Sequence, residues 1–349
     1  MKLWVTWWST WWHVTPITSL IIYIHQQRKF KDKVSQIYRF WETDSLEQKA
    51  ADWNAIFVPI KSWKIRRSRY YIWSNTIDIL QCTWWTLQLI FDFPKIDVLF
   101  SKWWYVSLPA TIAAWVHHIP ILVHESDTCA GLSTRIASYL ATHVCTGFDW
   151  VLKNAETVWQ ILNPNLRYTP SHDTTTHVLV NGWSQWSESL YRLAQTLAQH
   201  NPEMHFHVIN WFRNIYQGTL YDNLTVYDFW WAEQMWKLYS LCDRSITRWW
   251  VTSLQEQHIF RIKMIMIPLD ITHDQYHNCM HYTQFGHILI PQKPGREEIC
   301  LHTLIDYKKP SHVPDLGQWA DRVATILIDL GVAHLSKTKE SDVLAKNDE

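Results

Sequence analysis

Short apolar runs alternate with longer amphipathic stretches along most of the chain. In the first half, Leu3, Val5 and Thr6 predict a short buried strand, and Pro16 suits the first turn of a helix through Ile17 to Ile24. Further runs of strand length occupy residues 34–40, 55–60, 96–100 and 119–124, and stretches of helical length occupy 46–51, 77–91, 107–117 and 131–141. This alternation predicts βαβ units and a parallel sheet with helices on both faces.

The same alternation restarts after a polar interruption. Residues 163–176 are rich in Pro, Thr and Asn and low in apolar side chains, as in an interdomain linker. Beyond them, strands are predicted at 177–180, 205–209, 224–227, 245–247 and 262–267, with helices at 188–200, 235–241, 273–283 and 315–330 and a turn into a helix within 248–256. We expect an α/β chain with an N-terminal Rossmann-like domain at 1–163, a linker at 164–176, a second Rossmann-like domain at 177–335 and a frayed, charged tail at 336–349.

The loops after several of these strands contain tryptophan where a tight turn needs glycine. The chain has 25 Trp and 8 Gly in 349 residues, whereas average usage is about 7% Gly, or about 24 residues here. Six Trp-Trp pairs lie among polar or turn residues: 7–8, 11–12, 84–85, 103–104, 230–231 and 249–250. Tryptophan permits neither the positive φ nor the close backbone approach that glycine permits. These tryptophans therefore occupy positions where glycine would be expected.

Two explanations are open for this composition. We hypothesise that many of these tryptophans are glycines in the living cell, because UGA is read as glycine in some bacterial lineages. The alternative is a genuinely Trp-rich protein, such as a carbohydrate binder that stacks sugars on indole rings. Binders place single aromatic residues on rigid faces, which favours the first explanation. Trp115 and Trp319, beside helical stretches, are candidates for true tryptophans.

Charge and cysteine content narrow the class of protein. Lys plus Arg and Asp plus Glu number 32 each, so overall charge gives no reason to expect nucleic acid as a partner. The six cysteines form no close pair, which is typical of reduced thiols in a cytoplasmic protein. No apolar run approaches the length of a membrane span. Residues 61–73 carry five basic groups among apolar ones, and this segment suits either an anionic lipid surface or a solvated loop.

Seven short motifs occur in order over about 270 residues when the loop tryptophans are read as glycine. They are G-G-S-T-G-G-H at 7–13, G-G-Y-V-S-L-P at 103–109, H-E-S-D at 124–127, N-P-x-x-R at 163–167, G-G-S-Q-G-S at 182–187, R-G-G-V-T-S-L-Q-E at 248–256 and D-Q-x-x-N at 274–278. Together they resemble the MurG family, the peptidoglycan N-acetylglucosaminyltransferases that make lipid II from lipid I. A single glycine-rich loop would be weak support, but the ordered set is specific.

The resemblance implies a GT-B fold, in which two Rossmann-like domains face each other across a cleft and UDP-GlcNAc is held mainly by the second. Glu256 matches the glutamate that binds the ribose hydroxyls, Gln275 the residue that reads GlcNAc hydroxyls, and the backbone near Trp230 the uracil clamp. The full donor set that we expect is Thr10, Trp11, Trp12, Asp127, Arg167, Ser184, Gln185, Trp230, Arg248, Glu256 and Gln275. Asp127 departs from the asparagine usual in the family.

The chemistry of an inverting transfer requires a base for the acceptor's C4 hydroxyl and stabilisation of the leaving UDP. His13, in the first loop, is the first candidate for the base or for a phosphate contact, and Glu125, at another strand end, is the second. Ser9 and Tyr105 are the candidates for acceptor binding. The loop around Ser184 opens a helix, whose free N–H groups suit a diphosphate. We expect no metal and no cofactor, because no His, Cys or Asp cluster has ligand spacing.

Other functions stay open at this point. One is another GT-B sugar-nucleotide enzyme, such as a glycolipid glycosyltransferase or an epimerase. The other is an inactive sugar-binding homologue, which becomes preferred if indoles fill the loops at 11–12, 183 and 186. For the leading interpretation, the partners are UDP-GlcNAc, a lipid-linked pyrophosphoryl-MurNAc-peptide and the inner face of the cytoplasmic membrane, with no nucleic acid.

The recoding hypothesis predicts the mass of the natural product. Protein purified from its own cells should be lighter than the printed sequence by one Trp-to-Gly difference at each recoded position. Intact-mass spectrometry measures this directly, and the coding DNA gives an independent reading, with UGA at the recoded positions. A native mass that matches the printed sequence, with UGG codons throughout, would reject the hypothesis and favour the inactive homologue.

Overall fold

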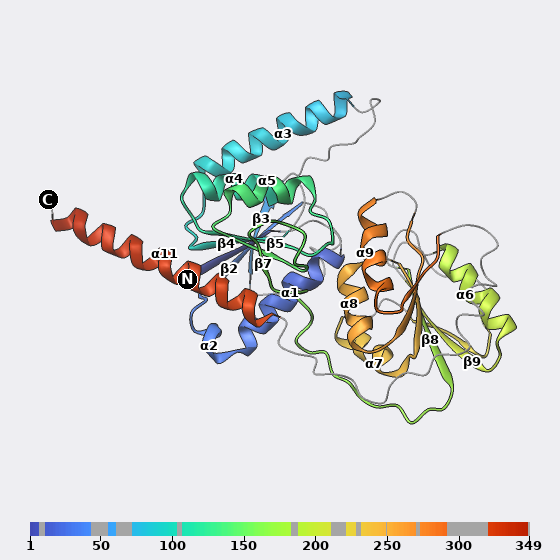
Figure 1. Cartoon of the computed structure of the whole chain (residues 1–349). Coiled ribbons are helices and arrows are strands. Elements are labelled where there is room, and N and C mark those ends of the chain that lie inside the picture. Colours follow the sequence, from blue (N-terminus) through green and yellow to red (C-terminus); the bar gives the residue numbers. More distant parts are fainter. Residues whose placement is uncertain are drawn as a thin grey trace. The chain divides into compact units, whose positions relative to one another are not determined.

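The computed structural model describes residues 1–6, 11–42, 55–60, 72–102, 107–182, 188–210, 221–227, 232–248, 250–269, 273–291 and 320–347. For 11–14, 39–42, 55–60, 72–75, 78, 232–234, 273–274 and 342–347 only the backbone is described. The chain forms two compact units, one from Met1–Pro164 with Trp319–Glu349 and the other from Asn165–Gln318 (Figure 1). This division, between Pro164 and Asn165, lies one residue from the end of the expected N-terminal domain at 163.

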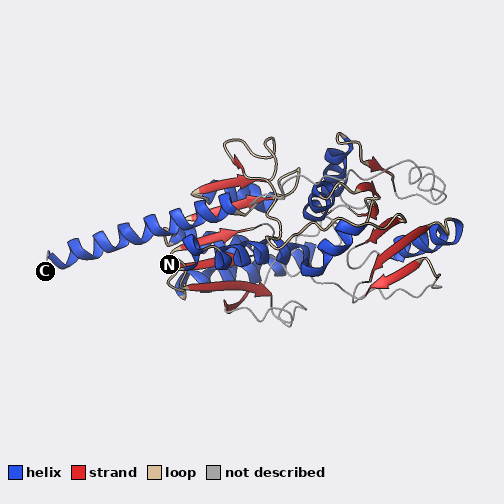
Figure 2. Ribbon diagram, turned by 90° about the horizontal axis from the view of Figure 1, so that it is seen from below, coloured by secondary structure: helices blue, strands red, loops and turns tan. Residues whose placement is uncertain are grey.

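Unit 1 is built on a parallel sheet in the order β3-β2-β1-β4-β5-β6-β7. The strands are β1 Lys2–Thr6, β2 Gln36–Glu42, β3 Ala55–Ile60, β4 Val98–Ser101, β5 Ile121–Glu125, β6 His143–Thr146 and β7 Glu156–Thr157. The helices are α1 Trp11–Gln26, α2 Arg28–Lys31, α3 Ile72–Phe91, α4 Ser107–Val116, α5 Leu132–Leu140 and α11 Asp321–Asn347. The predicted alternation is confirmed where the structure describes the chain, the helix predicted at 46–51 lies outside the described residues, and Figure 2 shows the strands of this unit side by side.

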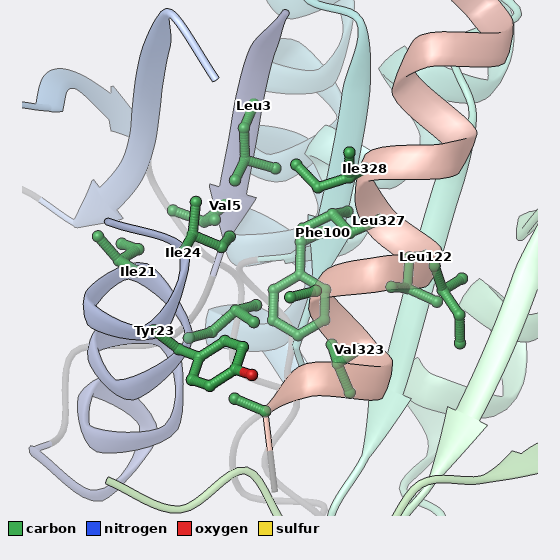
Figure 3. Close-up of a cluster of buried hydrophobic side chains, with 14 of the residues drawn as sticks. Leu3, Val5, Ile21, Tyr23, Ile24, Phe100, Leu122, Val323, Leu327 and Ile328 are labelled. Carbon is green, nitrogen blue, oxygen red and sulfur yellow. The ribbon is translucent and has the colours of Figure 1, made fainter. Parts of the chain in front are cut away.

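Alternate residues of the unit 1 strands enter two separate cores, as the pleat of a strand requires. Leu3 and Val5 of β1, with Phe100 of β4, pack against α1 and α11 (Figure 3). On the opposite face, Trp4 and Leu99 pack against α3, α4 and α5. Both faces of the sheet are therefore covered by helices, which is the condition for a stable parallel sheet.

The C-terminal helix α11 belongs to unit 1, which differs from the predicted boundaries at 335 and 336. Val323, Leu327 and Ile328 are fully buried in the core that α11 shares with α1 (Figure 3), and each such side chain contributes roughly 1.5–3 kcal/mol. Asp321, in the first turn, accepts hydrogen bonds from Tyr23 at 2.8 Å and Lys29 at 2.6 Å. The helix extends to Asn347, so the segment from 336, predicted as a frayed tail, is helical as far as the structure describes it.

The beginning of α1 is a second difference from the prediction. The helix starts at Trp11, and Pro16 lies inside it instead of in its first turn. Proline lacks the N–H that would donate to the carbonyl of residue 12, yet Ile17, Leu20 and Ile24 are fully buried in the unit 1 core. The burial of this apolar face outweighs the one lost hydrogen bond.

Unit 2 repeats the architecture with a parallel sheet in the order β10-β9-β8-β11-β12-β13. Its strands are β8 Thr176–Asn181, β9 Met204–Ile209, β10 Leu224–Tyr227, β11 Arg244–Thr247, β12 Lys263–Met266 and β13 Ile288–Leu289. Its helices are α6 Glu188–His200, α7 Ala232–Leu241, α8 Val251–Ile259 and α9 His273–Thr283. Val178, Phe206 and Ile246 form its core with Leu197 of α6. The predicted second Rossmann-like sheet is confirmed.

The described tryptophans differ in how well indole fits the backbone. Trp4 is fully buried and meets the ring of Phe93 edge-on at 5.0 Å between centroids. Trp159 is 54% exposed and has φ of 62°, in the left-handed region that costs a non-glycine residue roughly 1–2 kcal/mol. The conformation of Trp159 is thus one that glycine adopts without strain, whereas Trp4 fills a core site.

This contrast predicts opposite effects of the same substitution. Trp159→Gly should raise the free energy of unfolding, by at most about 1 kcal/mol, because relief of φ strain exceeds the entropy that glycine adds to the unfolded chain. Trp4→Gly should lower it by at least about 3 kcal/mol, because it empties a packed core site. Thermal unfolding of both variants checks this, and equal destabilisation by the two would show that the indole of Trp159 is a packed native group.

Candidate active site

The two sheets share one feature at their carboxyl ends. In unit 1 the strand order reverses between β1 and β4, and in unit 2 between β8 and β11. Such topological switch points are where open parallel sheets bind their ligands. At each one, the residue after the second strand donates its backbone N–H to the last residue of the first: Lys102 to Thr6 O at 3.2 Å, and Arg248 to Asn181 O at 3.3 Å.

In unit 1, the turn at 124–127 carries two carboxylates close to this point. Glu125, the last residue of β5, is fully buried, and Asp127 is nearly so. The N–H of Asp127 donates to Oε1 of Glu125 at 3.0 Å, which fixes the carboxylate against its own turn. The carbonyl of Glu125 accepts the N–H of Gly147 at 2.7 Å. The second candidate base is therefore held rigidly at a strand end.

Gly147 permits a close approach behind that turn. A Cβ on Gly147 would lie 2.0 Å from Nε2 of Gln160. This amide nitrogen donates to the carbonyl of Ser126 at 2.7 Å, and Gln160 itself is buried. The absent side chain at 147 thus leaves room for Gln160 to support the turn from below.

In unit 2, Glu256 lies on α8 beside a buried tyrosine. Oη of Tyr239 donates to Oε2 of Glu256 at 3.0 Å. Burial raises the pKa of Glu256 to about 7, and the hydrogen bond from Tyr239 opposes that rise. Burial, followed by the charge of Glu256, raises the pKa of Tyr239. The carboxylate is thus oriented by one donor and has a second oxygen for a hydroxyl ligand.

Two buried amides near this edge have polar atoms without a partner among the described residues. Gln275, in the first turn of α9, has its Oε1 in this state, and Asn181, at the end of β8, has both Oδ1 and Nδ2. Buried amides are ordinarily satisfied by protein or water. Gln275 was expected to bind sugar hydroxyls, and its free oxygen is suited to accept a hydrogen bond from one.

Arg248 and Arg167 make different contacts from those expected of phosphate ligands. Arg248 is buried, and its guanidinium donates to the carbonyl of Ile267 at 2.8 Å and to Ser189 at 2.7 Å. Burial lowers its pKa to about 10. Arg167 is exposed, with a hydrogen bond to the carbonyl of Leu166 at 2.8 Å. In this structure Arg248 acts inside unit 2, because it ties the residue that follows β12 to the start of α6.

Several expected site residues fall outside what the structure describes. These are Ser9, Thr10, Tyr105, Ser184, Gln185 and Trp230, while Trp11, Trp12 and His13 are described only as backbone of α1. His13 therefore lies in the first turn of a helix that follows β1. Its role as base or phosphate contact stays a prediction.

Sequence reasoning missed Lys102, Tyr239 and Asn181. Lys102 is almost completely buried directly after β4, and Asn181 directly after the buried run of β8. The available signal was a single polar residue at the end of an apolar strand, because side chains there face the ligand edge. Tyr239 gave no local signal, since its contact with Glu256 joins α7 to α8.

Among the described residues, no three His, Cys, Asp or Glu side chains are placed to hold a metal ion. None of the helices in the described ranges is both long and apolar enough to cross a bilayer.

Comparison with known proteins agrees with this geometry. Residues 13–146 match the glycosyltransferase family 28 N-terminal domain. A transferase of Streptococcus mutans, named UDP-N-acetylglucosamine--N-acetylmuramyl-(pentapeptide) pyrophosphoryl-undecaprenol N-acetylglucosamine transferase, is 29% identical over 265 residues, which is 70% of this chain and 72% of the relative.

Solved structures give the fold. The crystal structure of Acinetobacter baumannii MurG has a TM-score of 0.71 at 18% identity and covers 93% of this chain and 98% of its own. A UDP-N-acetylglucosamine 2-epimerase structure has a TM-score of 0.58 at 13% identity, covering 93% and 94%. The epimerase shares the two-unit architecture, so fold alone does not separate transfer from epimerisation.

Two parallel sheets with ligand edges at their switch points, together with a family 28 domain in unit 1, define a glycosyltransferase of the GT-B type. Within that class the match to the streptococcal transferase is longer than either unit, so it extends across both. The predicted resemblance is confirmed: this chain is a glycosyltransferase that resembles the MurG family.

Proposed function

We propose that the chain transfers GlcNAc from UDP-GlcNAc to the C4 hydroxyl of MurNAc in a lipid-linked pyrophosphoryl-MurNAc-peptide, giving lipid II for peptidoglycan synthesis. The observation that carries this proposal is the 265-residue match to a transferase named for that reaction, which spans both units. An epimerase is similar in fold only, at 13% identity.

The proposed reaction needs one base and one leaving-group site. The acceptor's C4 oxygen forms a bond to the anomeric carbon, the bond from that carbon to UDP breaks, and the hydroxyl proton passes to the base. Glu125 is a candidate for that base because its carboxylate lies at the carboxyl end of β5. His13 is the alternative, at the start of α1.

On the donor side, Glu256 and Gln275 supply oxygen acceptors for hydroxyl groups. Glu256 has Tyr239 to orient one oxygen, and Gln275 holds a buried oxygen without a described partner. The ribose of UDP and the sugar of GlcNAc both present hydroxyl donors. A buried acceptor paired with a ligand hydroxyl discriminates strongly against analogues that lack it.

We further propose that unit 1 docks on the anionic inner surface of the membrane, where the lipid acceptor resides. An apolar stripe on α3, made of Ile77, Leu80, Trp84, Leu87 and Phe91, is exposed along one side of the helix. Helix α5 carries exposed apolar side chains at similar spacing, namely Leu132, Ile136 and Tyr139. Helix α4 packs against both α3 and α5.

A lipid surface fits this stripe better than a protein does. The stripe contains no charged side chain, and the residues just before α3 include Lys64, Arg66, Arg67 and Arg69. Basic groups beside an apolar face bind anionic headgroups, at about 1 kcal/mol for each Lys or Arg. The segment 61–71, predicted to contact lipid, lies outside the described residues.

The proposed activity predicts a defined product. A chain made with glycine at the loop tryptophans should transfer radiolabelled GlcNAc to a lipid-linked MurNAc-peptide and release one UDP for each transfer. The same chain with the printed tryptophans should be inactive. Epimerised free sugar without a labelled lipid, or activity that requires no lipid acceptor, would contradict the proposal.

Substitution of Glu256 tests its role in binding UDP-GlcNAc. Because a protonated carboxyl accepts fewer hydrogen bonds, binding of UDP-GlcNAc should weaken as the pH falls below about 7, the value to which burial raises the pKa of Glu256. Glu256→Gln should bind about 10-fold more weakly at pH 8, and its affinity should change little between pH 6 and 8. Calorimetry measures both. Gln255→Glu, one residue away, is the matched control and should keep the wild-type pH dependence.

The membrane proposal predicts loss of vesicle binding when charge is placed in the stripe. The double variant Leu80→Glu, Leu87→Glu should bind phosphatidylglycerol vesicles at least about 10-fold more weakly, because two apolar side chains of roughly 1.5–3 kcal/mol each leave the lipid. Val332→Glu, an exposed apolar site on α11, should bind like the wild type. Sedimentation at low and high salt measures binding, and equal binding by all three proteins rejects the stripe.

A further inference from the structure

Lys102 is a buried cation at the switch point of unit 1. It follows β4, is 2% exposed and donates its backbone N–H to Thr6 at the end of β1. An ammonium group is costly to bury unless it is paired and hydrogen-bonded. The contacts of the Lys102 ammonium group therefore indicate the role of this buried charge.

The ammonium group of Lys102 bonds to the turn that carries Glu125. Nζ donates to Oγ of Ser126 at 2.7 Å and lies 3.3 Å from Nδ1 of His124. Nε2 of His124 lies 3.1 Å from the carbonyl oxygen of Trp159. A carbonyl only accepts, so Nε2 carries the hydrogen, and Nδ1 offers a lone pair to Lys102.

Charge supports the same arrangement. The described titratable groups that face Lys102 are His124, Glu125 and Asp127. Burial lowers the pKa of Lys102 to about 7, opposed by the carboxylates of Glu125 and Asp127. Burial and the charge of Lys102 hold the pKa of His124 well below its usual value, so His124 stays neutral. Among the described residues, Lys102 is thus a cation that faces the carboxylates of Glu125 and Asp127 and the neutral ring of His124.

A purely structural role would resemble that of Arg248, which occupies the equivalent place in unit 2. The head group of Arg248 binds the carbonyl of Ile267, the residue after β12, and Ser189 in the first turn of α6. The head group of Lys102 instead binds side chains of the turn between Glu125 and Asp127. The equivalence in backbone position and the difference in head-group partners separate the two residues.

We propose that Lys102 is a positioning residue for the transfer reaction: its ammonium group fixes the 124–127 turn and thereby aims the carboxylate of Glu125 at the acceptor hydroxyl. The proposal rests on the proposed function and assigns no proton transfer to Lys102 itself. The proton of the acceptor hydroxyl still passes to the base, and Lys102 keeps its own.

Lys102→Met tests this directly, because it keeps the length of the side chain and removes the charge. In the transfer assay, kcat should fall about 100-fold, the effect of a small misplacement of a reacting group, with KM for UDP-GlcNAc unchanged. The alkaline limb of the kcat/KM profile should disappear, since it reports the loss of the ammonium charge. Lys102→Arg should restore part of kcat and move that limb to higher pH.

Hydrogen exchange provides a readout that is independent of turnover. The N–H of Asp127, which bonds to Glu125, should exchange at least 10-fold faster in Lys102→Met than in the wild type, as measured by mass spectrometry of peptides covering 122–131. Lys95→Met, at an exposed lysine just before β4, should change neither exchange nor kcat.

The outcomes separate the two proposals. If the chain made with glycine at the loop tryptophans, and with Lys102 intact, makes no lipid product, the proposed function fails, and hydrogen exchange alone decides whether Lys102 fixes the turn. Unchanged exchange at Asp127, or an unchanged kcat and alkaline limb in Lys102→Met, overturns the positioning role. A Lys102→Met protein that fails to fold is replaced by Lys102→Gln, for which the same results are expected and the same results overturn the proposal.

Discussion

One hydrogen bond, made twice, sets the geometry of both candidate edges. The residue after the crossover strand donates its N–H to the last residue of the first strand, as Lys102 does to Thr6 and Arg248 to Asn181. At that point the strand order reverses, so the helices on either side run away from each other and leave the strand ends open. Polar residues are concentrated there because the edge is the part of each sheet that its helices leave uncovered.

The two units use this shared constraint differently. In unit 2 the buried cation, Arg248, stabilises the fold: its guanidinium donates hydrogen bonds to the carbonyl of Ile267 and to Ser189. The acceptor groups for ligand hydroxyls then come from α8 and α9, through Glu256 and Gln275. In unit 1 the buried cation faces the turn at the end of β5. Under the proposed function, the duplicated architecture has its charges distributed for two tasks, nucleotide-sugar binding and hydroxyl activation.

Local pattern was enough to predict most strands and helices, because buried parallel strands are short apolar runs between amphipathic helices. The strand at 224–227 and the helix at 273–283 have the predicted bounds. Pattern was not enough where contacts join distant segments. The place of α11 depends on Val323 and Leu327 meeting a core formed by residues 3–122, and the orientation of Glu256 depends on Tyr239 from another helix. The hydrophobic period of a helix or strand predicts which of its sides is buried, but not which distant segment packs against that side.

The tryptophans show most clearly what sequence pattern alone does not predict. Composition and turn position led to one rule for all loop tryptophans, but backbone geometry distinguishes individual sites. Trp159 holds a left-handed φ and offers its carbonyl to His124, so the atoms that matter to the site are backbone atoms that any residue provides. Trp4 contributes its ring to the core beside Phe93. The identity of the side chain is therefore immaterial to the hydrogen bond at 159, where glycine would keep the contact and lose only the strain.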